Sequence, residues 1–273
     1  MKNKPFVLNT HGSLLGYKKY LAAGLQQLPY QLYDTLTFKM SAKRADAVVV
    51  SSKFEYEDAV EFGINKNKLH IIPMGIDLVE SPVVKRQQNK AALDILFVGR
   101  LSRVRRVELL LQAVKSLSIP YHVTIVGGEE KTSSLQESGY LFELKKLCAD
   151  LGINDKVTFT GTKLPAELKP YYENADIFVY PSLYENFGQP LLEAAAEGLP
   201  IIATAVGLAR EIIQDGETGF IVPADPNVIR DRITRLFDTP TRNAMSKNIR
   251  ETVRHDYAWD NIIQRYIEIY KSL

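Results

Sequence analysis

Residues 180–204 read YPSLYENFGQPLLEAAAEGLPIIAT, and this stretch decides the fold that the sequence predicts. Apolar runs at 177–180 and 200–204 predict two buried strands, with a glycine-containing turn and a helix beginning near Gln189 between them. A strand, such a turn and a helix N-terminus together form an anion site, because free backbone N–H groups and the helix dipole face the ligand. The stretch therefore predicts a ligand-binding cleft beside this turn.

Two carboxylates, Glu185 and Glu193, lie eight positions apart in this stretch. Glu185 is expected on the loop at the mouth of the cleft, and Glu193 in the first turns of the helix, facing the same ligand. Like charges repel, so these carboxylates are better suited to accept hydrogen bonds from sugar or ribose hydroxyls than to bind phosphate. The alternative is structural: a solvated loop glutamate and a helix glutamate that stabilises the dipole.

The composition is that of an ordinary globular protein. The chain has 273 residues, 45% hydrophobic and 24% charged, enough for two domains or one large one. Its one cysteine, Cys148, excludes an internal disulfide and suits a reducing cytoplasm. No apolar run approaches the length of a membrane span, and no signal-peptide pattern begins the chain.

Positive charge is concentrated at the start of the sequence. Residues 1–53 carry eight Lys and Arg against two Asp, a local charge of +6. Aromatic residues lie among these basic ones, at Tyr17, Tyr20, Tyr30, Tyr33 and Phe38. Such a combination can dock on an anionic membrane surface. The alternative is a helix with a solvated basic face and a tyrosine-lined core face. Nucleic-acid binding is disfavoured, because no nucleic-acid motif is present.

Short β-rich runs alternate with helical stretches, which predicts α/β architecture with parallel sheets. A first block has strand candidates at 6–9, 47–51 and 69–72, with helical regions at about 14–44 and 53–62 between them. A second block has six strand candidates, at 94–98, 122–126, 156–160, 177–180, 201–203 and 220–222. Six strands with crossover helices form a complete Rossmann-like domain.

These blocks divide the chain into four parts. Residues 1–77 form an N-terminal part, 78–91 a polar linker, and 92–255 the Rossmann-like domain. Residues 256–273 predict a C-terminal helix, which is expected to pack back on the N-terminal part.

The central stretch resembles the E-x7-E signature of the retaining, GT-B-type glycosyltransferases of family 4. The residues that fit the family pattern are Pro181, Ser182, Glu185, Phe187, Gly188, Glu193, Ala194, Gly198, Pro200 and Thr204. The resemblance implies two Rossmann-like domains with the active site in the cleft between them. It makes residues 92–255 the domain that binds the nucleotide-sugar donor, and residues 1–77 part of the acceptor-side domain.

The first block resembles only the C-terminal half of such an acceptor-side domain. Three parallel strands alone leave an unpaired edge and uncovered apolar faces. Three explanations stay open: the sequence begins inside a longer protein, another chain supplies the remainder, or a partner covers the edge. Each puts the activity of the isolated chain in doubt.

An arginine cluster follows the predicted strand at 94–98 and comprises Arg100, Arg103, Arg105 and Arg106. The residues Gly99-Arg100-Leu101, with Arg105 and Arg106 after them, resemble the family's GRL-x-x-x-K-G segment, whose Arg and Lys hold the donor diphosphate. Arg105 occupies the Lys position and Arg106 the Gly position. Guanidinium groups suit a diphosphate because they donate paired hydrogen bonds and neutralise charge. The alternative for Arg100 and Arg105 is a pair of solvated arginines at a helix start.

His11 and Gly12 follow the first predicted strand and resemble the family's T-x-H-G segment. There the histidine faces the donor sugar across the cleft, and the glycine permits close backbone approach. The alternative is a capping or core histidine.

Three weaker matches complete the resemblance. Gly75 lies in IIPMGID, which resembles an interdomain segment and favours a hinge role. Gly127 and Gly128 end the run VTIVGG, which resembles a turn near the nucleotide phosphates. Lys163 and Leu164 follow TG in a turn that flanks the nucleotide base in the family.

Metal chemistry has little support in the sequence. No D-x-D pair and no Cys/His cluster at zinc spacing is present, so we expect no metal and no cofactor. Arg100, Arg105 and the helix amides would then stabilise the departing diphosphate alone. The amides of Asn186, Phe187 and Gly188 would orient the sugar together with Glu185, and Glu193 would hold the ribose.

The resemblance thus implies an enzyme of glycan biosynthesis. It would transfer a hexose, with retention, from a UDP- or GDP-sugar to a glycan or lipid-linked acceptor. Its expected location is cytoplasmic, and the basic N-terminal segment allows peripheral contact with the inner face of the membrane. A first alternative is a donor-binding subunit or inactive paralogue that needs a partner chain. A weaker one is a nucleotide-sugar epimerase, against which the E-x7-E context argues.

Overall fold

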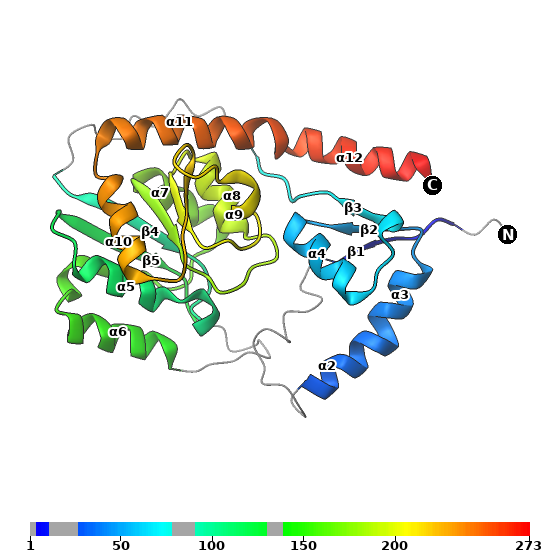
Figure 1. Cartoon of the computed structure of the whole chain (residues 1–273), viewed down its shortest axis with the longest axis horizontal. Helices are drawn as coiled ribbons and strands as arrows, with labels where there is room; N and C mark the ends of the chain where they lie inside the picture. The colour runs from blue at the N-terminus through cyan, green and yellow to red at the C-terminus, as the bar shows by residue number, and fades with distance from the viewer. Residues whose placement is uncertain (1–3, 11–26, 78–90, 130–138) are drawn as a thin grey trace.

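The computed structural model describes residues 4–10, 27–77, 91–129 and 139–273. His11, Gly12, residues 14–26 of the expected first helical region and almost all of the expected linker at 78–91 lie outside the described residues. Within the described part the chain forms two parallel sheets, the larger on the left of Figure 1 and the smaller on the right. This confirms the predicted α/β architecture.

The larger sheet has six strands in the order β6-β5-β4-β7-β8-β9. Their bounds are Leu93–Val98 (β4), Tyr121–Val126 (β5), Val157–Phe159 (β6), Ile177–Tyr180 (β7), Ile201–Ala203 (β8) and Gly219–Ile221 (β9). The four side chains of β7 are completely buried, as expected where helices cover both faces of a parallel sheet. The strand order reverses beside β4, which places the carboxyl ends of β4 and β7 at a switch point where ligands bind.

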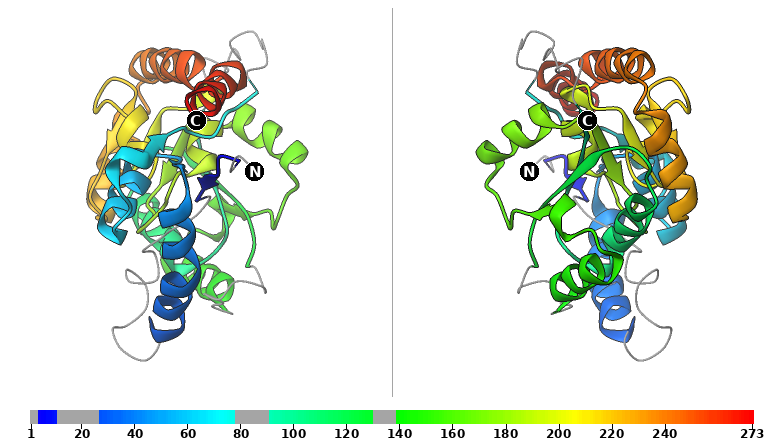
Figure 2. Two further views of the ribbon diagram at one scale, coloured as in Figure 1. Left: turned by 90° about the vertical axis from the view of Figure 1, so that its right-hand side faces the viewer. Right: turned by 90° about the vertical axis from the view of Figure 1, so that its left-hand side faces the viewer.

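Helices connect these strands and cover the sheet. Their bounds are Val107–Lys115 (α5), Tyr140–Leu151 (α6), Pro165–Asn174 (α7), Gln189–Ala196 (α8), Ala209–Ile212 (α9), Pro226–Arg235 (α10) and Thr239–Asp256 (α11). Figure 2 shows α11 along the top of the molecule and α10 down one side of the larger domain. β9 begins at Gly219, one residue before its predicted start, where Gly219 pairs with Ile201 and a Cβ would lie 2.2 Å from the Ile201 carbonyl oxygen. Only glycine permits this approach.

The smaller sheet has the order β1-β2-β3, with strands Val7–Asn9, Ala47–Val50 and Leu69–Ile71. Helix α4 (Lys53–Phe62) begins where the Ser52 hydroxyl accepts a hydrogen bond from the Glu55 amide, and it ends at the left-handed Gly63. The described part of the first helical region comprises α2 (Leu28–Tyr33), a π-helical turn η2 (Asp34–Phe38) and α3 (Lys39–Arg44).

Helix α12 (Trp259–Ser272) lies over the smaller sheet, while α11 lies over the larger one (Figure 1). Ile262 and Ile269 of α12 are buried in a cluster with Val49 of β2 and Ile72, which directly follows β3. Gly75 packs against the first residue of α12, where a Cβ on Gly75 would lie 2.4 Å from the Trp259 ring. Among the described helices, none has the length and apolar character needed to cross a membrane.

Candidate functional site

Glycines at the carboxyl ends of β4, β5 and β6 form a floor of bare backbone. The Gly127 amide donates to the Gly161 carbonyl at 3.0 Å, and the Gly99 amide donates to the Val126 carbonyl at 3.0 Å. Gly127 has φ of 141°, and a Cβ there would lie 1.9 Å from the Gly99 carbonyl oxygen. The structure therefore brings Gly99 and Gly127 together at the predicted edge, and at Gly127 only a glycine fits.

Arg105 and Glu185 form the best-defined charged contact at this edge. Arg105 Nη1 lies 2.6 Å from Glu185 Oε2, and the two side chains are only 11% and 17% exposed. Arg105 Nη1 also donates to Ser182 Oγ at 3.1 Å and to the Tyr184 carbonyl at 3.0 Å. The sequence predicted a diphosphate role for Arg105 and a sugar role for Glu185, without predicting that the two hold each other. Their pairing fixes the loop that carries Glu185.

Tyr180 lies beneath this ion pair. Its hydroxyl donates to Glu185 Oε2 at 2.7 Å, and the Arg105 guanidinium lies 5.7 Å from the centre of its ring. Complete burial raises the pKa of Tyr180 well above its ordinary value, and Glu185 raises it further, whereas Arg105 and Arg100 act to lower it. Arg100 is exposed, yet it is near enough for this electrostatic effect. The two arginines matched to the family segment therefore act on one buried hydroxyl.

The rest of the predicted arginine cluster is divided by the fold. Arg103 turns toward α6, where Nη2 lies 2.5 Å from Glu143 Oε1 and the guanidinium stacks over the Tyr140 ring. Arg106 is left-handed, with φ of 49°, and is the only non-glycine residue with positive φ in the described part of the chain. The family pattern has glycine at that position, and this backbone conformation explains why.

The turn between Glu185 and α8 is held tightly. Gly188 has φ of 88°, and a Cβ there would lie 2.8 Å from a methyl group of Leu191 and 3.0 Å from Glu185 Cγ. The Phe187 side chain is buried, and its carbonyl accepts from the Leu208 amide at 2.7 Å. Phe187 therefore anchors the turn, and the predicted helix start follows directly at Gln189.

Glu193 lies on α8, one turn after the helix begins. Its Oε2 accepts a hydrogen bond of 2.6 Å from the Tyr172 hydroxyl of α7. Burial raises the pKa of Glu193 above its ordinary 4.5, although the hydrogen bonds from Tyr172 and Gln189 act to lower it. The carboxylate is thus half-buried and hydrogen-bonded, and its contact with a ribose stays a prediction.

Lys163 and Leu164 lie between β6 and α7. The Leu164 side chain is 69% exposed, and its amide donates to Glu167 Oε2 at 2.8 Å, which caps α7. Lys163 is half-buried. Neither contacts Glu185 or Glu193 in a described interaction, so their proximity to a nucleotide base stays a prediction.

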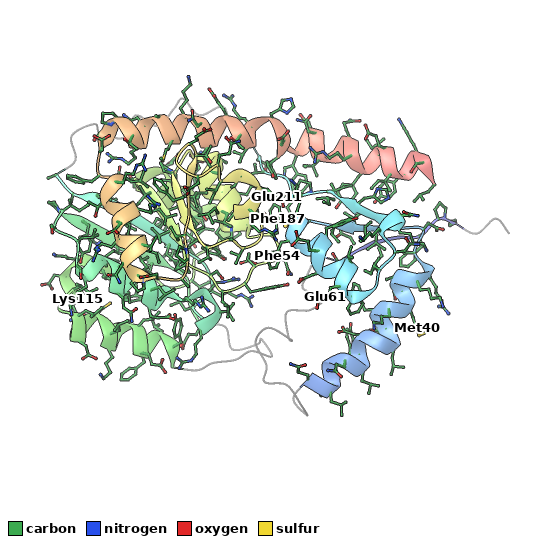
Figure 3. All side chains as sticks on the ribbon, viewed as in Figure 1. Met40, Phe54, Glu61, Lys115, Phe187 and Glu211 are labelled. Carbon is green, nitrogen blue, oxygen red and sulfur yellow. The ribbon has the colours of Figure 1, made fainter. Side chains whose placement is uncertain are left out.

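Residues from the smaller sheet also reach the site, and the sequence did not predict them. The Ser52 hydroxyl donates to the Asn186 carbonyl at 2.5 Å, and the Tyr184 hydroxyl donates to Asp58 Oδ2 at 2.7 Å. The Lys53 amide at the start of α4 donates to Glu211 Oε1 of α9 at 2.8 Å, and Figure 3 labels Phe54 of α4 and Glu211 at this boundary. Tyr184 lies inside the quoted stretch, but nothing in the sequence pattern indicates its partner 126 residues away.

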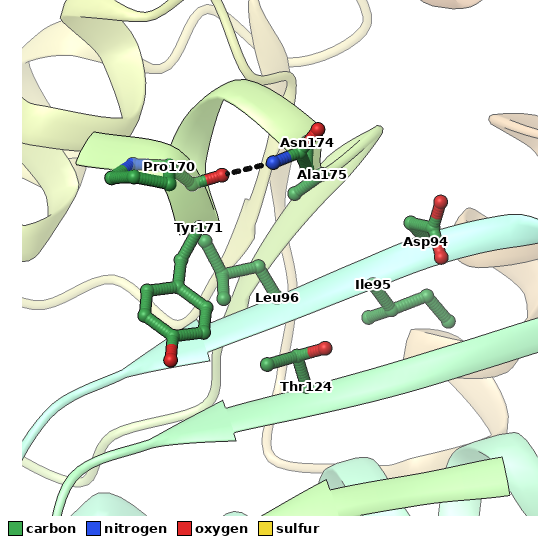
Figure 4. Close-up of a pocket in the computed structure, with 8 residues that line it drawn as sticks. All are labelled: Asp94, Ile95, Leu96, Thr124, Pro170, Tyr171, Asn174 and Ala175. Carbon is green, nitrogen blue, oxygen red and sulfur yellow. Dashed lines mark hydrogen bonds between the residues drawn. The ribbon is translucent and has the colours of Figure 1, made fainter. Parts of the chain in front are cut away.

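Other features of the structure do not add to this site. A cavity of about 190 Å³ lies between the start of β4, β5 and α7, away from the strand ends that carry the glycines (Figure 4). Its lining includes Asp94, Tyr171 and Asn174, and no predicted site residue. In the described ranges no group of three or more His, Cys, Asp or Glu side chains could hold a metal ion. The absence of a metal requirement stays a prediction.

Comparison with known protein families gives two adjoining matches. The model of glycosyl transferases group 1 matches residues 83–252, and that of glycosyltransferase family 4 matches residues 1–80. The chain is 32% identical, over 247 residues, to D-inositol 3-phosphate glycosyltransferase of Corynebacterium urealyticum, covering 84% of this chain and 57% of that protein. It is 28% identical to an uncharacterized glycosyltransferase of Methanocaldococcus jannaschii, covering 98% of this chain and 69% of that one.

Two solved structures share the fold. Sucrose-phosphate synthase from Thermosynechococcus elongatus superposes with a TM-score of 0.80 at 29% identity, covering 97% of this chain and 67% of that one. HepE of Anabaena, solved in complex with UDP and glucose, gives a TM-score of 0.82 at 20% identity, covering 98% and 72%. The chain therefore spans little more than half the length of the Corynebacterium relative and about two thirds of these solved chains.

Proposed function

The chain belongs to the glycosyl transferases group 1 family, and we propose that it transfers a hexose, with retention, from a nucleotide-diphosphate sugar to an acceptor hydroxyl. Membership confirms the resemblance that the E-x7-E stretch indicated. One observation carries the proposal further: the ion pair of Glu185 and Arg105 lies at the carboxyl edge of the six-stranded sheet, beside the N-terminus of α8. That edge is where a parallel sheet binds its ligand.

Different residues bind different parts of the donor in this proposal. Glu193 accepts hydrogen bonds from the ribose hydroxyls, a role for which its half-buried carboxylate on α8 is suited. Arg100, exposed after β4, binds the diphosphate, whose close approach the bare backbone at Gly99 and Gly127 permits. The positive charge of Arg100 stabilises the negative charge that develops as the diphosphate leaves.

Glu185 orients the sugar, together with the backbone amides of Asn186, Phe187 and Gly188. Arg105 neutralises the carboxylate of Glu185 and holds it against the Tyr180 hydroxyl, so the carboxylate points in one direction before the donor arrives. Arg105 also adds positive charge near the diphosphate. His11 and Gly12, outside the described residues, keep their proposed places opposite the sugar on the acceptor side.

The test is calorimetric titration of the chain with UDP, GDP and ADP and with their common sugars, without added metal. We expect one nucleotide to bind, with UDP tried first because HepE was solved with it. Glu193→Ala should weaken that binding about a hundredfold, since a carboxylate that accepts two hydroxyl hydrogen bonds contributes roughly 3 kcal/mol. Glu197→Ala, one turn further along, is the matched control. An unchanged affinity in Glu193→Ala would remove Glu193 from the ribose role.

A second candidate is a donor-binding subunit that works with a partner chain. Strand β1 favours it, because among the described residues β1 pairs only with β2 and leaves its other edge open. This candidate predicts the same nucleotide binding, but turnover only when a partner is added. A purified chain that binds donor and also transfers sugar to an acceptor would exclude it.

We also propose that the acceptor is presented at an anionic membrane surface. Leu28, Leu32, Leu36 and Met40 follow one another at intervals of four along α2, η2 and α3, and each is about half exposed. Lys39, Lys43 and Arg44 lie at the end of the same helical segment. Exposed apolar side chains next to basic ones suit the interface of an anionic bilayer. The chain is expected to sediment with phosphatidylglycerol vesicles but not with phosphatidylcholine vesicles. A chain that sediments with neither kind of vesicle would overturn this proposal.

A further inference from the structure

The turn that carries Glu185 is held from two sides. The larger domain holds it through Arg105 and through the Leu208 amide, as described above. The second support comes from the smaller sheet, through Ser52 and Asp58 of the α4 region. Ser52, Asp58 and Tyr184 are 0%, 4% and 5% exposed, so these polar groups meet in a buried contact between the two parts of the molecule.

The hydrogen bonds of this contact define one arrangement. The Tyr184 hydroxyl lies 2.7 Å from Asp58 Oδ2 and 2.5 Å from Asn186 Oδ1. A hydroxyl has one proton, so Tyr184 cannot donate to both oxygens. The contact is satisfied when the Asn186 amide is turned so that its NH2 group donates to Tyr184, and Tyr184 donates to Asp58. The result is a chain from Asn186 through Tyr184 to the carboxylate of Asp58.

Exposed contacts surround this buried chain. The Phe54 ring packs edge-on against the Tyr184 ring at 5.2 Å, and Arg210 stacks on Phe54 while pairing with Glu57 at 2.7 Å. Exposed ion pairs of this kind contribute roughly 0–1 kcal/mol, whereas a buried hydrogen bond to a charged group contributes roughly 1.5–3 kcal/mol. The buried chain through Asp58 is therefore the part of the contact that fixes geometry.

We infer that Asp58 is a positioning residue for the donor-sugar site, acting through Tyr184 and Asn186 on the turn that carries Glu185. Tyr184 and Asn186 are the residues on either side of Glu185; Tyr184 bonds Asp58 directly, and Asn186 is linked to Asp58 through Tyr184. The backbone of the turn is thereby set by a residue of α4, the helix beside the smaller sheet, so the sugar subsite is complete only while the two parts are docked. This inference rests on the proposed function, since it gives the turn a sugar to bind.

The experiment compares Asp58→Asn and Tyr184→Phe with Glu57→Ala, an exposed change on the same helix. Calorimetry measures UDP and UDP-glucose separately, because Asp58 should affect the sugar and not the nucleotide. We expect the first two variants to bind UDP-glucose about tenfold more weakly while UDP affinity changes less than about twofold. Because both act through one chain, the double variant should be no weaker than either single one. A purely structural role for Asp58 predicts equal losses for both ligands.

Amide hydrogen exchange of residues 184–188 gives a second readout that needs no ligand. We expect exchange to accelerate about tenfold in Asp58→Asn and Tyr184→Phe, and not in Glu57→Ala. Unchanged exchange, or UDP-glucose affinity equal to wild type in both variants, would overturn the inference. If the wild-type chain binds neither UDP nor UDP-glucose, the proposed UDP-sugar function fails instead, and the exchange measurement still decides whether Asp58 positions the turn.

Discussion

The six-stranded sheet is covered by helices that follow its own strands, whereas the three-stranded sheet takes part of its cover from helix α12 at the far end of the chain. One continuous cluster of buried residues fills the larger domain, and two small clusters support the smaller sheet. The domain that carries Glu185 and Glu193 therefore has a continuous core of its own, although the turn of Glu185 is also held by α4. The smaller sheet depends on contacts that are distant in sequence, and these are its vulnerable part.

The largest expected effect lies in the backbone floor of the larger domain. Gly127→Ala places a Cβ 1.9 Å from the Gly99 carbonyl oxygen at φ of 141°, so we expect a loss of at least about 3 kcal/mol in unfolding free energy. Urea denaturation measures it. Gly152→Ala is the control, because Gly152 also has positive φ but its Cβ would meet nothing within 4 Å. Equal losses in the two variants would mean that the floor is not closely packed.

The next effect should fall on the smaller sheet alone. Ile262→Ala removes a fully buried side chain between α12 and the sheet, at a cost of about 3 kcal/mol. Hydrogen exchange should show β1, β2 and β3 opening more readily while β7 and β8 keep their protection. Ile263→Ala, with a side chain 48% exposed, is the matched control and should change stability by less than about 0.5 kcal/mol. Uniform loss of protection in both sheets would show that the domains unfold as one unit.

The pH dependence of nucleotide binding tests the proposed role of Glu193. Burial raises the pKa of Glu193 above 4.5, so its carboxyl stays protonated to a higher pH than in the unfolded chain. Only the deprotonated form accepts hydrogen bonds from two ribose hydroxyls, so nucleotide affinity should rise with pH through this raised pKa, by up to about tenfold per pH unit below it. By the same sign, ionising Glu193 lowers folding stability as pH rises between the unfolded and folded pKa values. Calorimetry of Glu193→Gln should show no such rise of nucleotide affinity with pH. An affinity profile identical to that of the wild-type chain would assign the pH dependence to another group.

The smallest expected effect concerns Arg106. At φ of 49° an alanine is strained and a glycine is not, so Arg106→Gly should be more stable than Arg106→Ala by about 1 kcal/mol. Comparing the two variants removes the contribution of the lost guanidinium. Equal stability, measured by thermal unfolding, would mean that the turn relaxes away from the left-handed conformation.

Much of the fold could be predicted because its signals are local. The strand at Ile177–Tyr180 was recognised from its continuous apolar run, which is typical of a buried parallel strand. Helix α4 was predicted at its observed bounds, Lys53–Phe62, between a capping serine and a glycine. The π-helical turn at Asp34–Phe38 was not predicted, because its distinguishing hydrogen bonds have no equivalent periodic signal.

The candidate site could be predicted only in part. The sequence pattern identified Glu185, Glu193, Arg100 and Arg105, and the structure places the glycines and arginines that follow β4 at the expected sheet edge. It did not indicate that Arg105 pairs with Glu185 or that Tyr172 binds Glu193, since each pair joins different elements. Arg103 was predicted in the cluster, yet the direction of its backbone takes it to Glu143.

By itself the sequence determined the parallel α/β fold and the family, because hydrophobic periodicity and the E-x7-E context are written in neighbouring residues. Only the tertiary structure decided which side chains meet. The hydrogen bond between Tyr184 and Asp58 spans 126 residues, and it exists because α4 docks against the turn of the larger domain. Such a contact depends on the packing of two separate sheets, a property that no local stretch of sequence contains.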